Sequence, residues 1–147
     1  MTKLGSVSAI VDTNVLVYTT DQNLPGHAAS LELLNRCARK EIDWRMTPQI
    51  VLEFLSIVVE RKRVARPITS ERAWAAMTKL RQACPLVAPP EDLVDRVEAL
   101  VSIVRPRGPE IFDLAIAATA LANGITTIYT YDQAVFSRVP GISVLTP

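Results

Sequence analysis

Four acidic residues of this chain stand at positions where a parallel α/β fold would gather functional groups. Asp12 and Asp132 each follow an apolar run that we expect to be a buried strand, whereas Glu53 and Asp113 fall in the first or second turn of expected helices. In an open parallel sheet, such positions lie near the edge where strands end and helices begin. We therefore expect the four carboxyl groups to meet, although they are spread over most of the sequence.

The chemistry of such a group follows from its charge. Several carboxylates brought together repel one another, and at neutral pH that cost is tolerable only with a cation between them. Oxygen ligands without histidine or cysteine suit Mg²⁺ or Mn²⁺. An ion of this kind can turn bound water into a nucleophile and stabilise charge on a phosphate. The pattern predicts a divalent-metal site and suggests hydrolysis of a phosphodiester.

Each of the four acids also has a purely structural explanation. Asp12 could cap the helix that follows it, and Glu53 could belong to a narrow solvated stripe on its helix. Asp132 could simply be a turn residue. Asp113 is the hardest to explain in this way, because it is the only charged residue of an alanine-rich helix, although a helix-dipole role remains. The joint placement of the four favours the metal site.

The elements that must position these acids alternate along the chain. Apolar runs predict strands at 7–11, 43–46, 125–130 and 142–146, with a further short strand within 85–90. Helical spacing and capping residues predict helices beginning near Pro25, at 47–63, from Thr69 or Ser70 with Trp74 on its buried face, at 91–104 and at 111–122. The sequence therefore predicts an α/β fold in a single domain, residues 1–147, with a mainly parallel central sheet flanked by helices on both faces.

The amino-acid composition limits the class of protein and the cellular compartment that we expect. Hydrophobic residues make up 49% of the 147 residues and charged residues 21%, enough to build a core. The net charge of +1 shows no basic surplus for nucleic acid, although clustered acids would mask one. No apolar run is long enough for a membrane span, and two distant cysteines favour a reducing cytoplasm.

Several short motifs, taken together, are similar to a known family. VDTNVLVY at the start, an isolated Glu53 in a helix, IFDLAIAATALANG and TYDQAVF occur in order and with fitting spacing. The chain resembles PIN-domain ribonucleases and, among them, the VapC-like toxins of type II toxin–antitoxin systems. The resemblance implies a PIN-like fold and cleavage of RNA with Mg²⁺ or Mn²⁺. It also implies a homodimer and silencing by a cognate antitoxin.

The resemblance also implies roles for particular residues. The catalytic and metal-binding residues would be Asp12, Glu53, Asp113 and Asp132, with Asn14 and Thr130 supporting them by hydrogen bonding. Tyr131 stands where a small or polar residue is common in the family. Glu110 is an additional acid that could join the site, although we favour a role at the start of its helix.

Basic residues near the expected site could contact RNA. Arg105 and Arg107 precede Asp113 and are the better candidates for phosphate contact. The run from Arg61 to Arg63 is interpreted as a solvated helix end, where cations complement the helix dipole.

Two other classes of protein remain as alternatives. A catalytically inert PIN-like binding module would have no electrostatic reason to keep four clustered acids. Another metal-dependent phosphate hydrolase, such as a phosphatase, would need paired acids where Asp12-Thr13-Asn14 offers one, and a receiver domain would need a late lysine, yet none follows Lys79.

Overall fold

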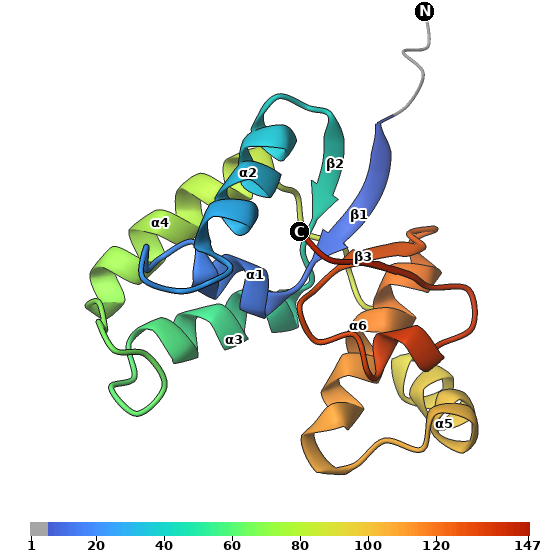
Figure 1. Ribbon diagram of the computed structural model, residues 1–147. Helices are drawn as coiled ribbons and strands as arrows, with labels where there is room; N and C mark the ends of the chain where they lie inside the picture. Colours follow the sequence, from blue (N-terminus) through green and yellow to red (C-terminus); the bar gives the residue numbers. More distant parts are fainter. Residues whose placement is uncertain (1–5) are drawn as a thin grey trace, which may run out of the picture.

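Four parallel strands form one sheet with the order β2-β1-β3-β4 in the computed structural model, which describes residues 6–147 (Figure 1). Residues 1–5, part of the predicted domain, lie outside the described residues. The strands are β1 (Val7–Val11), β2 (Ile42–Arg45), β3 (Thr127–Tyr129) and β4 (Ser143–Leu145).

Helices cover both faces of this sheet. Figure 1 shows α1 to α4 on one side of the strands and α5 and α6 on the other. The α-helices are α1 (Thr13–Tyr18), α2 (His27–Ala38), α3 (Pro48–Val58), α4 (Ser70–Ala83), α5 (Leu93–Val104) and α6 (Ile111–Ala122). Two short 3₁₀ helices, η1 (Gly108–Glu110) and η2 (Phe136–Arg138), precede α6 and β4. The predicted α/β fold with a parallel sheet between helices is confirmed.

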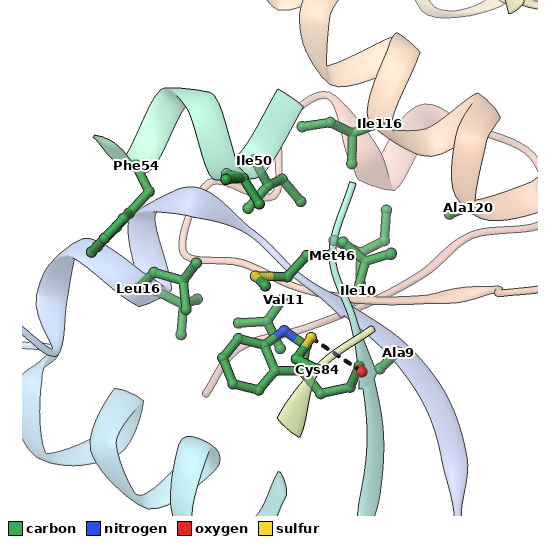
Figure 2. Packing of buried hydrophobic residues seen from close by; sticks show 14 of the residues in the cluster. Ala9, Ile10, Val11, Leu16, Met46, Ile50, Phe54, Cys84, Ile116 and Ala120 are labelled. Carbon is green, nitrogen blue, oxygen red and sulfur yellow. Dashed lines mark hydrogen bonds between the residues drawn. The ribbon is translucent and has the colours of Figure 1, made fainter. Parts of the chain in front are cut away.

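The central strand explains why the first apolar run does not alternate with polar residues. Ala9, Ile10 and Val11 are fully buried, because β1 lies between β2 and β3 and both of its faces are covered. In Figure 2, Leu16 and Phe54 lie on one side of the strands and residues of α6 on the other. Burial on both faces fixes the position at which β1 ends, and hence the position of Asp12.

Two helices begin at the threonines that the sequence suggested. Thr47 accepts a hydrogen bond from the Ile50 N–H at 3.2 Å, and Pro48 occupies the first turn. Thr69, rather than Ser70, caps α4 by accepting from the Arg72 N–H at 3.3 Å. Because α3 begins at Pro48, Glu53 lies in the second turn of that helix.

The end of α3 differs from the prediction. The helix ends at Val58 instead of continuing to residue 63. The Val58 carbonyl, which a longer helix would pair with the Lys62 N–H, accepts from the Ile68 N–H at 2.9 Å. The Lys62 N–H instead faces the Glu60 carboxylate at 3.3 Å. The chain therefore turns back after α3 and forms a closed loop over residues 59–69.

Two smaller predictions were also wrong. Residues 85–90 form no strand, only a bridge between Met46 and Leu86, because prolines at both ends remove backbone donors. Trp74 is half exposed on α4, where Ala73 and Met77 occupy the buried face instead. In the described part of the chain, no helix has both the length and the apolar character needed to cross a bilayer.

Candidate active site

The four predicted acids line one hollow of about 330 Å³, called here the acid hollow. Parallel pairing of β1 with β3 sets Val11 opposite Tyr129, so that the residues following these two strands are neighbours. α3 and the first turn of α6 bring the remaining two carboxyl groups to the same place. The lining of the acid hollow includes Asp12, Glu53, Asp113 and Asp132 together with Thr13, Asn14, Tyr18 and Arg63.

Asp12 is the most firmly held of the four. Its side chain is almost wholly buried, at 7% exposure, and both carboxylate oxygens have donors. The Thr13 N–H donates to Oδ1 at 2.8 Å and the Thr130 hydroxyl donates to Oδ2 at 2.9 Å. Asp12 also caps α1, so its structural explanation and its place in the acid hollow are compatible.

Thr130 joins the ends of β1 and β3 through a single hydroxyl group. The hydroxyl is fully buried, donates to Asp12, and accepts from Asn14 Nδ2 at 3.1 Å and from the Asp132 N–H at 3.0 Å. Asn14 Oδ1 in turn accepts from the Tyr131 N–H at 3.3 Å. Asn14 and Thr130 thus hold the backbone around two of the acids, which is the geometry that a supporting role requires.

Glu53 is tied to the same network through Thr13. The Thr13 hydroxyl donates to Glu53 Oε2 at 3.0 Å, while Gln49 Nε2 donates to Oε1 at 2.8 Å. Thr13 therefore contacts two acids, Asp12 with its N–H and Glu53 with its hydroxyl. This link was not predicted, since it depends on the direction of a side chain on α1.

Burial and mutual repulsion disturb the ionisation of two acids. Burial raises the pKa of Asp12 from its ordinary value of 3.8 to about 6, against the hydrogen bonds from Thr130 and Thr13, and the charges of Glu53 and Asp132 raise it further. Burial raises the pKa of Asp113 to about 7, and the neighbouring carboxylates, led by Asp12, add to the effect. Burial together with repulsion between carboxylates favours the binding of a cation among them.

The chemistry of the donors fits a hard divalent cation. The oxygen donors that line the acid hollow are carboxylate, hydroxyl and amide groups, which suit Mg²⁺ or Mn²⁺ better than a softer metal. In residues 6–147, however, no three His, Cys, Asp or Glu side chains are grouped closely enough to hold one ion as they stand. Binding would therefore require the carboxylates to rotate toward a common point.

Several other predicted residues lie away from the acid hollow. Arg105 and Arg107 are exposed and do not contribute to its lining. Glu110 accepts from the Arg107 N–H at 3.0 Å and lies 3.4 Å from an Arg138 nitrogen, so its carboxylate serves the start of α6. Tyr131 turns away from the acids, because its hydroxyl donates to the Gly26 carbonyl at 3.0 Å.

Arg63 is the residue that the sequence interpretation missed. In the part of the chain that the structure describes, it is the one basic residue that lines the acid hollow. Extending α3 to residue 63 would have placed it about 15 Å along the helix from Glu53. The closed loop after Val58 brings it back instead.

A larger hollow of about 680 Å³ lies between α5 and α6, lined by apolar residues such as Val94 and Phe112 with Glu98 as its one charged residue. Although larger, it offers no group of acids or nucleophiles, so the acid hollow is the better candidate for chemistry.

Comparison with known proteins agrees with this fold and identifies its family. The family model of the PIN domain matches residues 9–142, nearly the whole chain, and the protein therefore belongs to the PIN domain family. Within that family it groups with the VapC ribonucleases. It is 31% identical over 118 residues to VapC ribonuclease Mb2897 of Mycobacterium bovis and, to the same extent, to ribonuclease VapC43 of Mycobacterium tuberculosis. The match covers 79% of this chain and 80% of either relative.

Solved structures share the fold at lower sequence identity. Mycobacterium tuberculosis VapC20, described as a toxin that cleaves the sarcin-ricin loop, superposes with a TM-score of 0.69 at 17% identity, covering 95% of this chain and 99% of that one. VapBC2 of Rickettsia felis, bound to a DNA fragment from its promoter, gives 0.68 at 18% identity, with coverage of 95% and 98%.

Proposed function

We propose that this protein is a metal-dependent endoribonuclease, the toxin of a toxin–antitoxin pair, which hydrolyses RNA phosphodiester bonds with Mg²⁺ or Mn²⁺. The observation that carries the proposal is the convergence of Asp12, Glu53, Asp113 and Asp132 on one hollow at the carboxyl ends of the parallel strands. The names of its ribonuclease relatives supply the substrate class.

Some residues of the chain would bind the ion, and others would hold those carboxylates in position. Asp12, Asp113 and Asp132 would bind the ion, and Glu53 would complete its shell or orient the attacking water. A bound divalent ion supplies an activated water and stabilises charge on the phosphate in the transition state. Asn14, Thr130 and Thr13 would keep the carboxylates in place through the hydrogen bonds described above.

The free-energy cost of holding these acids together disfavours the alternative of a catalytically inert binding module. Asp12, which is buried, and Asp113, which is half-buried, lie near other acids and carry raised pKa values, so ionising them at neutral pH destabilises the fold. A binding module that held no ion would gain stability by replacing either. A metal-dependent hydrolase of another phosphate ester would share the site, and only its substrate separates it from the ribonuclease.

A cleavage experiment tests the proposal. Purified protein is incubated with a mixed RNA pool in Mg²⁺, in Mn²⁺ and in chelator, beside an Asp113→Asn variant. Metal-dependent cutting that the variant loses supports the ribonuclease. Intact RNA under every metal would reject it, and hydrolysis of a small phosphate ester by the same protein would favour the other hydrolase.

Protein partners are also proposed, a cognate antitoxin and a second copy of the chain. Two sets of exposed apolar side chains support such contacts, since apolar patches on a surface commonly mark protein interfaces. Trp74 on α4 is 50% exposed, whereas Val94 on α5 and Phe112 on α6 are 79% and 56% exposed. Light scattering of Val94→Asp and Trp74→Asp variants, with and without the antitoxin, would show which surface binds the antitoxin and which binds the second copy of the chain.

The two cysteines are free thiols, which fits a reducing cytoplasm as the compartment in which the protein would encounter RNA and the antitoxin.

A further inference from the structure

Arg63 occupies the point where three adjoining hollows meet. It lines the acid hollow, a second hollow beside η1 and the start of α6, and a third between the α1–α2 connection and the α3–α4 loop. The second hollow shares Glu53, Asp113 and Asp132 with the acid hollow, and the third shares Tyr18. The three adjoining hollows are together called the depression here; Arg63 lines all three, and the acids line two of them.

The guanidinium of Arg63 is available for a ligand. The residue is exposed, and among residues 6–147 its side chain makes no ion pair or hydrogen bond. The helix-end explanation for this cation is weakened, because α3 ends at Val58, five residues earlier, and the dipole acts only within the last turn. An arginine without an internal partner, beside several acids that line the same hollow, is suited to bind an anion that must approach those acids.

The loop that carries Arg63 is closed by backbone hydrogen bonds. The Ile68 N–H donates to the Val58 carbonyl at 2.9 Å, and the Arg63 and Val64 N–H groups donate to the Glu60 carbonyl at 2.9 and 3.1 Å. These bonds fix the position of the Arg63 backbone, from which its side chain extends. Fixing the backbone that carries a side chain before binding removes part of the entropy cost of a contact.

Tyr18 forms the wall between the acid hollow and the third hollow. Its ring packs against Tyr131 with centroids 4.8 Å apart, and the Tyr131 hydroxyl bonds Ser30 and the Gly26 carbonyl. The Tyr18 ring is thus held by packing, and an aromatic ring can stack against a base. Arg66 also lines the third hollow, so that with Arg63 and Asp21 the charged residues of its lining carry a net positive charge.

We propose that Arg63 binds a phosphate of the RNA strand adjacent to the one that is cleaved, and that Tyr18 supports the neighbouring nucleotide, so that the strand follows the depression past the acids. This inference rests on the proposed ribonuclease function. It assigns substrate binding to a loop residue that holds no metal. Repulsion between the acids and the RNA backbone would then be offset by a cation built into the protein as well as by the metal.

Binding is tested separately from cleavage. Fluorescence anisotropy of a labelled single-stranded RNA is measured with Mg²⁺ in an Asp113→Asn background, which does not cleave. Adding Arg63→Gln should weaken binding about tenfold, and lower the dependence of log K on log salt by about 0.7, as for the loss of one phosphate contact. Arg63→Lys should recover part of the affinity, because it restores the charge without the bidentate geometry.

The matched control is Arg61→Gln, which removes the same charge from the same loop at a position outside all three hollows. Equal weakening by the two variants would overturn the proposal, since only the net charge would then matter. An unchanged affinity in Arg63→Gln would overturn it as well. In the cleaving protein, Arg63→Gln should raise KM more than it lowers kcat.

Different results would refute the ribonuclease function and the Arg63 binding site. A wild-type protein that cuts no RNA, yet binds it through Arg63, would refute the ribonuclease and keep the binding site. A protein that cuts RNA equally well with Arg63→Gln would refute the Arg63 site alone. Melting temperatures check folding, and a large fall in Arg63→Gln would count against a pure binding role.

Discussion

Replacing Asp113 by asparagine should make the metal-free protein more stable at pH 8. In the folded chain Asp113 titrates near 7, whereas in the unfolded chain it titrates near its ordinary 3.8. Between these pH values the folded state binds more protons, so the free energy of unfolding of the wild type falls as the pH rises from about 4 to about 7. Asparagine cannot ionise, so its contribution to stability does not change with pH.

The size of the effect follows from the two pKa values. A difference of about three pKa units corresponds to at most about 4 kcal/mol, because each unit is worth about 1.4 kcal/mol. Asp113 is only half-buried, so solvent screens part of the repulsion and we take about half of this value. We therefore expect a net gain of about 2 kcal/mol at pH 8, or a melting temperature higher by roughly 4–8 °C. The gain should vanish near pH 4, where both side chains are neutral.

The assay is thermal unfolding followed by circular dichroism, in chelator, at intervals from pH 4.5 to pH 8. Glu91→Gln serves as control, because this exposed acid lies before α5 and outside the acid hollow. Parallel curves for wild type and Asp113→Asn, or a less stable variant at pH 8, would show that Asp113 is not buried among like charges. The carboxylates would then repel one another too weakly to favour a bound cation.

Three further outcomes are expected. Mg²⁺ or Mn²⁺ at a hundred times its dissociation constant should stabilise the wild type by about 2.7 kcal/mol, and calorimetry should show no such gain in Asp12→Asn. Thr130→Val should cost about 1–3 kcal/mol in urea unfolding and weaken metal-dependent cleavage, because it removes the donor to Asp12, and Thr130→Ser should restore both. Gly26→Ala should lower the melting temperature by an amount equivalent to about 1–3 kcal/mol, since its Cβ would clash with Tyr18 Cδ2 and lie 2.9 Å from the Tyr131 ring. An additional Tyr18→Ala change should relieve part of the clash, and no loss in Gly26→Ala would show that the close approach is absent.

The sequence located the acids well because strand ends are strongly determined. Burial of Ile10 and Val11 on both faces leaves Asp12 as the first residue that can leave the sheet, and the same holds for the residues after Tyr129. Alternation of strands with helices then places the other two acids at the same edge. These are consequences of burial and topology, which hydrophobic patterns reflect directly.

Features that depend on side-chain direction or on loop closure were not predictable in this way. The bond from Thr13 to Glu53 joins residues 40 positions apart and has no periodic signal. Helical propensity and charge favoured a continuous α3, and a single long-range bond to the Val58 carbonyl overrides them. Because α3 was expected to continue to residue 63, Arg63 was not placed near the acids. Trp74 was assigned to the core by spacing alone, although small Ala73 fills the buried position instead.

The order of strands in the sheet has a consequence for synthesis of the protein. β1 is made first but lies in the middle, and its second partner, β3, follows α4, α5 and α6 along the chain. A growing chain that has emerged only as far as α5 holds Asp12 and Glu53 but neither of the other acids, and it lacks the Thr130 hydroxyl that fixes Asp12. The hollow is therefore among the last features that can form as the chain is made.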